Sequence, residues 1–402
     1  MVRAPSVNAS ALGWRGYQLL LLAAAMGAGG YVRTAISPLQ ETMRIALSIS
    51  DNHMALLQGP VIGIPITLAA VPLGLLIDRY SRVRLLSVLI LLTLLASLFT
   101  AFASSFSLLL LARCLAGLTG LSTIPVVFSL LADLYEPAQR GRATTVVAIG
   151  QLGGISAAFA LGGALLAMKG SDPDGWRWTM LWLTAPLVPA ALLMLALREP
   201  IRRERAIANP SARQVWDELR HYRTVIGPLV VGVILVETAV GAMMIWAAPM
   251  LARVFGLQPD RVGSIMAMVT LVGGIVGPLV GGPVADLCQR AGGPRRTVSM
   301  LSGLALLVAD MTIMLAVAVM GMTLFTIVIP NEIRGLCMSA FVAANLLFVF
   351  AVAPVTVSLL SGAIGGLAMI GTALSVVCAT SAALAAATFA FAMQTMPPVT
   401  LQ

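Results

Sequence analysis

Eleven long apolar runs constrain the fold of this chain more than any other feature. They occupy residues 14–37, 54–77, 83–103, 105–134, 142–168, 177–197, 224–251, 261–286, 297–320, 336–360 and 363–393. A helix needs about 20 mostly apolar residues to cross a bilayer, because each backbone amide must be hydrogen-bonded within the segment. Charged residues make up only 10% of the 402 positions, against about a quarter in soluble proteins. We therefore predict an all-α membrane protein with about 11–12 transmembrane helices, and we exclude soluble enzyme folds and disordered chains.

The distribution of basic residues predicts the orientation of these spans. With the N terminus inside, 18 of the 25 Lys and Arg residues fall in inside segments, five in outside loops and two within spans. This pattern satisfies the positive-inside rule. It predicts a multi-pass membrane protein with a cytoplasmic N terminus, whose partner is the lipid bilayer.

Other partner and cofactor classes lack a matching sequence pattern. The net charge is +9, but the arginines are spread over short loops and form no continuous basic face, so no nucleic-acid partner is expected. The four cysteines lie far apart with no C-x-x-C spacing, which indicates neither a metal site nor a disulfide framework. We expect no bound cofactor, and proton coupling stays open. We also expect the protein to be a monomer.

A polar stretch from Arg198 to Arg223 divides the chain into two halves. It predicts a six-helix bundle over 1–197, a cytoplasmic linker over 198–223 with an interfacial helix near Trp216–Tyr222, and a second bundle over 224–402. Within the second bundle, an inside loop with Arg295 and Arg296 and an inside-type turn ending at Arg334 should be separated by two crossings, and only Thr297 to Ile329 lies between them. These residues span about 50 Å as a helix, too little for two crossings of a ~30 Å core. The second bundle is therefore predicted to be about one helix short near 297–329, and the side of the C terminus stays open.

A short motif recurs at the matching inside turn of each half. Gly74, Asp78 and Arg82, with Arg79 beside them, follow the second run, and Gly282, Asp286 and Arg290 follow the eighth. Internal repeats of this kind are typical of transporter folds. The Asp side chains are expected to pair with the arginines as a latch that opens when the bundles move. The alternative is that these arginines only set the membrane orientation.

Several stretches resemble the major facilitator superfamily, most closely its bacterial Spinster-like branch. They are Leu56-Leu57-Gln58 with Asp78-Arg79, Leu130 to Pro137 with Arg140 and Arg142, Gly175-Trp176-Arg177, Arg198-Glu199-Pro200, Trp246 to Pro249, Arg253 to Leu257, and Pro330 to Gly335. The resemblance implies two helical bundles around a central cavity at the middle of the membrane. Two acidic residues common in that branch are missing: Val32 precedes the span-one arginine, and the run from Gly117 to Gly120 lacks a glutamate.

Charged residues inside membrane spans are the main candidates for function, because each costs about 2.5 kcal/mol or more at a helix centre. Glu237 lies in span seven, and we predict that it carries a proton; alternatively it is a protonated acid bonded to a carbonyl. Arg33 is expected to bind an anion or an acid, or to snorkel to the outer interface. Arg113, which the resemblance places toward the cavity, is a second cationic candidate, with structural pairing as its alternative. Asp310 is the fourth.

Two lone amides, Gln58 and Asn345, are further cavity candidates, and each can instead bridge helices. Two cationic residues and one acid in an otherwise apolar cavity predict a secondary active transporter that works by alternating access. Its solute is expected to be a small organic molecule that is amphiphilic or anionic. The resemblance suggests lysolipid-like molecules. The alternatives are proton-driven multidrug efflux of hydrophobic cations and a transport-dead facilitator-like protein. An enzyme is not expected, because no nucleophile–base pair or nucleotide-binding loop is found.

Overall fold

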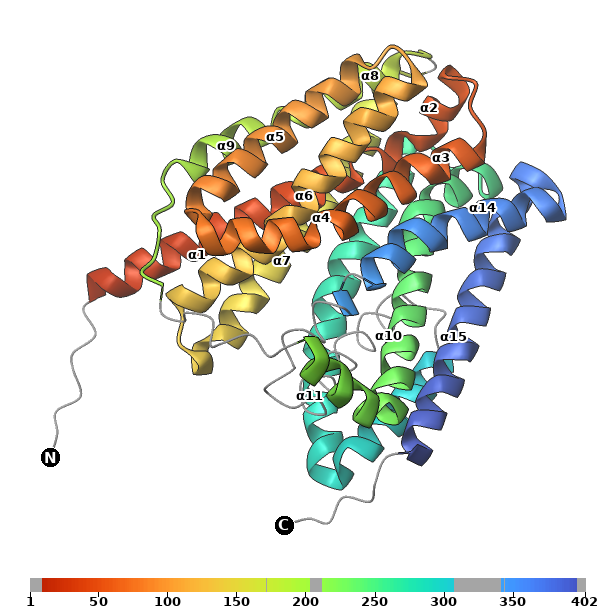
Figure 1. The fold of residues 1–402 in the computed structure, drawn as a ribbon. Coiled ribbons are helices and arrows are strands. Elements are labelled where there is room, and N and C mark those ends of the chain that lie inside the picture. Colours follow the sequence, from red (N-terminus) through yellow and green to blue (C-terminus); the bar gives the residue numbers. More distant parts are fainter. Residues whose placement is uncertain (1–8, 171, 203–211, 307–340, 343, 396–402) are drawn as a thin grey trace, which may run out of the picture.

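The computed structural model of the 402-residue chain describes all residues except 1–8, 171, 203–211, 307–340, 343 and 396–402 (Figure 1). The described residues are almost entirely helical. Their helices agree with the prediction of an all-α membrane protein, since nine of them are long and apolar enough to cross a membrane.

The described part of the first half contains nine α-helices and one short 3-10 turn. They are α1 (Ala9–Thr34), η1 (Ser37–Leu39), α2 (Gln40–Ala46), α3 (Asp51–Gln58), α4 (Pro60–Arg79), α5 (Arg82–Phe102), α6 (Phe106–Leu134), α7 (Pro137–Ala167), α8 (Gly175–Thr184) and α9 (Leu187–Met194). Serine side chains start three of these helices by accepting a backbone N–H, namely Ser50, Ser81 and Ser105. Such caps satisfy amides that have no partner in the first turn.

The described part of the second half contains four α-helices, a π-helical turn and a 3-10 turn. They are α10 (Ala212–Val254), α11 (Pro259–Leu306), the π-turn η2 (Leu347–Val352), α14 (Ala353–Ile364), η3 (Gly366–Met369) and α15 (Ile370–Thr395). The α10 helix packs mainly along α15.

The two halves form two bundles that lie close together at one end and diverge toward the other. In Figure 1 they meet near α2, α3 and α14, while the start of α1 and the lower end of α11 lie far apart. We call the end with α2, α3 and α14 the clasp end, and the end with the starts of α1 and α5 the basic end.

The bundles also touch through backbone atoms of α7 and α11. Gly163 and Gly263 face each other so closely that a Cβ on Gly263 would lie 2.5 Å from the carbonyl oxygen of Phe159. A Cβ on Gly163 would collide with the carbonyl oxygen of Pro259. Small residues allow this helix approach in membranes.

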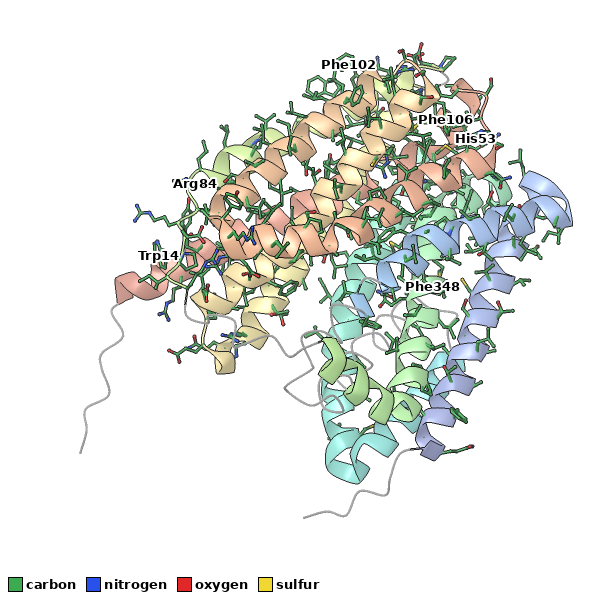
Figure 2. All side chains as sticks on the ribbon, viewed as in Figure 1. Trp14, His53, Arg84, Phe102, Phe106 and Phe348 are labelled. Atoms are coloured by element: carbon green, nitrogen blue, oxygen red, sulfur yellow. The ribbon has the colours of Figure 1, made fainter. Side chains whose placement is uncertain are left out.

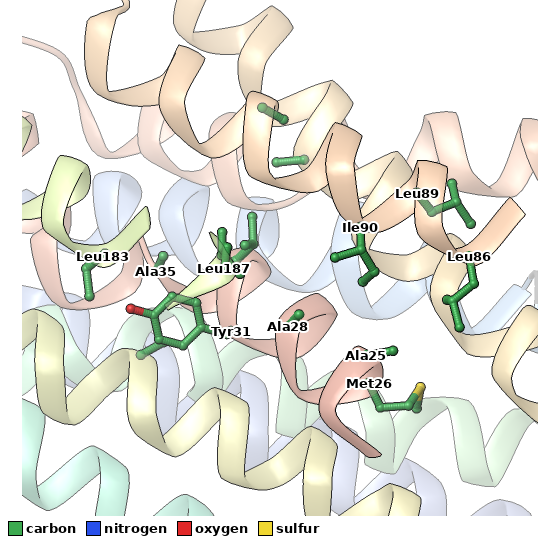
Figure 3. Packing of buried hydrophobic residues seen from close by; sticks show 14 of the residues in the cluster. Ala25, Met26, Ala28, Tyr31, Ala35, Leu86, Leu89, Ile90, Leu183 and Leu187 are labelled. Atoms are coloured by element: carbon green, nitrogen blue, oxygen red, sulfur yellow. The ribbon is translucent and has the colours of Figure 1, made fainter. Parts of the chain in front are cut away.

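The core of the first bundle surrounds α1 (Figure 3). Buried residues of α1 such as Ala28 and Tyr31 lie among Ile90 of α5, Leu183 of α8 and Leu187 of α9. This central helix ends at Thr34, immediately after Arg33, so the packed core fixes where Arg33 enters the interface between the bundles.

Three predicted boundaries differ from the structure. The run 177–197 is split into α8 and α9 around Pro186, because a proline interrupts helical hydrogen bonding. The helix expected within the linker is the first part of α10, which continues from Ala212 through the membrane-spanning segment. An inside loop was expected between 286 and 297, but α11 remains helical across it and its ribbon bends there (Figure 1). Most of the shortened region 297–329 lies outside the described residues.

Candidate functional site: a polar cavity between the bundles

A cavity of about 200 Å³ lies where the two bundles meet. Its polar lining residues come from both halves: Arg33, Thr34, Ser37 and Gln58 from the first, and Glu237 and Asn345 from the second. Apolar side chains of α10 and the π-turn, including Met244, Val349 and Phe350, complete the wall. Four of the six residues predicted to bind substrate or protons therefore share one cavity.

The first bundle contributes a chain of hydrogen bonds beside the cavity. The Ser37 hydroxyl donates to Gln58 Oε1 over 2.8 Å, and Gln58 Nε2 donates to Gln40 Oε1 over 2.5 Å. Gln58 sits at the last turn of α3, just before the helix break at Gly59. Both ends of its amide are occupied, so Gln58 mainly orders the wall of the cavity.

The two charged residues of the cavity have no ionic partner among the described residues. Neither the Glu237 carboxylate nor the Arg33 guanidinium makes a hydrogen bond or ion pair to any residue in that part of the chain, and both are partly exposed to the cavity. The contact that Arg33 does make is with the Phe350 ring, whose centroid lies 5.3 Å from its Cζ atom. An acid and a base that are unpaired in a membrane-embedded cavity are available to a ligand.

Asn345 adds an unsatisfied acceptor to the second bundle's wall. Its Oδ1 atom is buried and has no hydrogen-bond partner in the described structure. Buried polar atoms are nearly always paired in proteins. Asn345 therefore presents an acceptor that a ligand with a donor group can use.

Arg113 does not line the cavity, which corrects its predicted role as a substrate ligand. It is fully buried, and its guanidinium donates to the carbonyl oxygens of Leu57, Val32 and Arg33 over 3.5, 3.3 and 3.0 Å. These carbonyls lie at the ends of α1 and α3. Arg113 thus joins α6 to the two helices that present Arg33 and Gln58, which is the structural alternative considered above.

Replacing Arg113 with Gln is expected to destabilise the protein by about 1.5–3 kcal/mol, because charge-assisted hydrogen bonds to buried carbonyls are lost. The free energy can be followed by reversible unfolding in mixed detergent micelles. Arg33→Gln is the matched control and should change stability much less, since Arg33 donates no hydrogen bond to the described residues. Equal stability of the two variants would contradict a structural role for Arg113.

Asp310, the remaining predicted site residue, lies outside the described residues. The side chains of Gly282, Asp286 and Arg290 are also not described, so the second predicted latch is placed only as backbone of α11.

The predicted pairing of Asp78 with Arg82 in the first latch is wrong. Arg82 pairs with Asp133 of α6 over 2.5 Å and with Glu199 over 3.1 Å, and not with Asp78. Asp78 and Arg79 are exposed at the last turn of α4, next to Gly74. Arg202 from the linker binds the backbone carbonyl of Asp78. Asp78 and Arg82 belong to different helices, because α4 ends at Arg79, the chain turns at Tyr80, and α5 begins at Arg82.

Glu199 is the organising residue of this ionic cluster. It accepts hydrogen bonds from the Ser81 hydroxyl at 2.6 Å and from the Val83 amide at 2.8 Å, at the start of α5. Partial burial alone would raise the pKa of Glu199, but these bonds and those from Arg82 hold it below its usual value. The carboxylate thus caps α5 and ties the linker to the first bundle.

At the clasp end, an ionic cluster joins the two bundles that the sequence did not reveal. Arg253 at the end of α10 contacts Glu41 of α2 over 2.6 Å. It also binds both oxygens of Asp51 at the start of α3, over 2.7 and 2.8 Å. Arg44 adds a 2.6 Å pair with Glu41. We call these four residues the clasp.

The clasp closes one side of the central cavity. A smaller cavity of about 120 Å³, lined by Ser37 and Glu41, lies between the clasp and the main cavity, and Ser37 borders both. A second link between the bundles, from the Ser358 hydroxyl to Asn52 Oδ1 over 2.7 Å, reinforces this end. The ionic contacts of the clasp and this hydrogen bond therefore hold the described parts of the two bundles together at the clasp end.

Sequence relatives share parts of this chain. A segment of 226 residues is 29% identical to a triacylglyceride transporter of Mycobacteroides abscessus, covering 55% of this chain and 41% of that protein. A segment of 167 residues is 28% identical to the quinolone resistance protein NorB of Staphylococcus aureus, covering 42% of this chain and 32% of that protein. The matches thus span less than half of the length of these curated relatives.

Solved transporter structures share the whole fold. A bacterial homologue of the human lysosomal transporter Spinster, in an inward-facing and unoccupied conformation, matches with a TM-score of 0.71 and 21% identity over 94% of both chains. The nucleoside transporter NupG matches with a TM-score of 0.70 and 11% identity over 95% of this chain and 99% of that one.

The family model described as Major Facilitator Superfamily matches residues 19–376, nearly the whole chain. The family and the structural neighbours are those of a membrane transporter, not an enzyme. The fold, the cavity between two bundles and this match agree, and the chain belongs to the Major Facilitator Superfamily.

Proposed function

We propose that the chain is a secondary active transporter of the bacterial inner membrane that moves a small amphiphilic or anionic organic solute by alternating access. The observation that carries the proposal is the cavity in which the two bundles place Arg33 and Glu237 without ionic partners, and Asn345 with an unpaired Oδ1 atom, in the described structure. A site at the interface of two bundles is exposed to one side at a time when they rock.

Arg33 supports an anionic group on the solute. Its guanidinium offers planar donors that match a carboxylate or phosphate. The apolar wall from Met244, Val349 and Phe350 suits an alkyl portion. The similarity to a triacylglyceride transporter favours an amphiphile of the same broad chemical class.

Proton coupling is assigned to Glu237, the acid of this cavity. A carboxyl group that alternates between the two sides can take up a proton on one and release it on the other. We assign the basic end, with Arg82, Arg84 and Arg140, to the cytoplasm on the basis of the positive-inside rule, and with it the N terminus.

Two eight-carbon amphiphiles test the solute class. Octyl phosphate and octyltrimethylammonium share a tail and differ in the charge of the head group. In nanodiscs, octyl phosphate should raise the melting temperature of the protein, and Arg33→Gln should remove this shift. Labelled octyl phosphate should then exchange across proteoliposomes that contain the protein.

A shift with the cation alone, lost in Glu237→Gln, would overturn the anionic assignment and favour efflux of hydrophobic cations, in keeping with the partial similarity to NorB. Binding without exchange across the membrane would instead indicate a transport-dead protein.

A further inference from the structure

The π-turn η2 holds one aromatic ring at the boundary between the bundles. Phe350 lies in the middle of Leu347–Val352 and lines the cavity, with its ring centroid 5.3 Å from Cζ of Arg33. A cation within about 6 Å of an aromatic face is attracted to it. Since Arg33 belongs to the first bundle and Phe350 to the second, this contact crosses the interface.

Three glycines fix the backbone that carries this ring. A Cβ on Gly59 would collide with the carbonyl oxygen of Phe350, and a Cβ on Gly63 would lie 2.9 Å from the Cβ of Phe350. On the opposite side, a Cβ on Gly241 of α10 would lie 2.7 Å from the carbonyl oxygen of Val349. Both bundles thus approach the π-turn by backbone alone.

The π-helical geometry also changes the direction in which the following side chains point. A π-turn inserts one residue into a helix and shifts the side chains that follow, and such turns are frequent at functional sites. Trp246 holds the end of the turn through a 3.0 Å hydrogen bond from its indole nitrogen to the carbonyl oxygen of Pro354. The position of Phe350 is therefore determined by its surroundings and not by a free loop.

Stacking on an aromatic ring uses the face of a guanidinium and leaves its N–H groups, which lie in the plane, free. Arg33 donates no hydrogen bond to the described residues, so the ring is its sole partner in that part of the chain. A long side chain without other restraint would lose about 2 kcal/mol of rotamer entropy on binding an anion.

We propose that Phe350 is a positioning residue for Arg33: its ring holds the guanidinium so that the free donors face the cavity, ready for the anionic group of the solute. The inference rests on the function proposed above and deepens it. It assigns part of the anion affinity to an apolar residue of the opposite bundle.

The test compares Phe350→Leu with Phe350→Trp in nanodiscs. Leu keeps an apolar side chain but removes the aromatic face, whereas Trp keeps the stronger cation–π partner. Phe350→Leu should weaken binding of octyl phosphate roughly 3- to 30-fold. Phe350→Trp should stay within about threefold of the parent protein.

Phe348 is the matched control, because it lies in the same π-turn, is 42% exposed and does not line the cavity (labelled in Figure 2). Phe348→Leu should leave binding of octyl phosphate unchanged. Binding of octyl phosphate that is weakened as much in Phe350→Trp as in Phe350→Leu would show a disturbed cavity and overturn the positioning role.

A measurement without solute separates this inference from the proposed function. Phenylglyoxal modifies arginine side chains, and mass spectrometry can follow its reaction at Arg33. Loss of the ring should speed this reaction about threefold or more in Phe350→Leu, as expected for a cation–π restraint of this strength, and not in Phe348→Leu. An unchanged rate would overturn the inference even if octyl phosphate binds. A faster rate without binding of octyl phosphate to the parent protein would contradict the proposed function alone.

Discussion

Glu237→Gln should abolish the response of transport to a pH gradient while solute exchange continues. The amide has nearly the shape of the acid but cannot carry a proton. A gradient of one pH unit can support about tenfold accumulation of a solute that moves with one proton, since one unit corresponds to 1.36 kcal/mol. In Glu237→Gln, the accumulation ratio in proteoliposomes should fall to about one.

The matched control for this prediction is Asp260→Asn, which removes a carboxylate from the exposed first turn of α11. It should accumulate solute as the parent protein does. Undiminished, pH-dependent accumulation in Glu237→Gln would show that another group carries the proton, and Glu237 would then be a structural acid of α10.

Arg253→Ala should shift the protein strongly away from the state described here. The substitution removes three charge-assisted hydrogen bonds between the bundles, to Glu41 and to both oxygens of Asp51. Since only 10% of the Arg253 side chain is exposed, these contacts are poorly screened by water. Their loss should cost the clasp-closed state about 2–3 kcal/mol, a change of roughly 30- to 150-fold in the ratio of the two states.

Spin labels on the two sides of the clasp end can measure this shift. Ser104 lies between α5 and α6, Gln258 lies between α10 and α11, and both are exposed. In a background without the native cysteines, the distance distribution should move to longer values in Arg253→Ala. Arg261→Ala, which removes an exposed arginine of α11 without an ion pair in the described structure, should leave it unchanged. An unaltered distribution in Arg253→Ala would mean that the clasp does not hold the bundles.

The cavity could be predicted from the sequence because charges inside apolar spans are costly and therefore conspicuous. Arg33 and Glu237 were identified in this way, Gln58 and Asn345 were identified as lone amides in apolar spans, and all four line one cavity. The same rule could not separate Arg33 from Arg113. Both are arginines in apolar helices, and only the packed structure shows that backbone carbonyls surround Arg113.

Residues of ordinary type for their position could not be found from the sequence. Phe350 is one apolar residue among many in its helix, and no pattern predicts a π-turn there. In the sequence, Arg253 is only one of the basic residues of the outside loops, and Asp51 belongs to no motif. One signal could have revealed these residues. Spans one and seven are equivalent in the two repeated halves, so their outer ends are expected to lie close together, and the sequence has an arginine after span seven and acidic residues after span one.

The predicted latch shows a different limit of sequence analysis. Asp78 and Arg82 are four residues apart, a spacing that allows contact within one helix. The helix ends between them, however, and Arg82 turns to Asp133 and Glu199. Spacing predicts a pair only when both residues belong to the same element.

The glycine contact between α7 and α11 determines how the halves can move. At Gly163 and Gly263 two backbones touch, and beside them Phe159 of α7 packs with Val262 and Met266 of α11 in one buried apolar cluster. The glycine contact brings the helices together at one point, and the cluster keeps them joined there. A tilt of one half on the other must therefore repack these side chains, whereas it must break the ionic contacts of Arg253 at the clasp end outright.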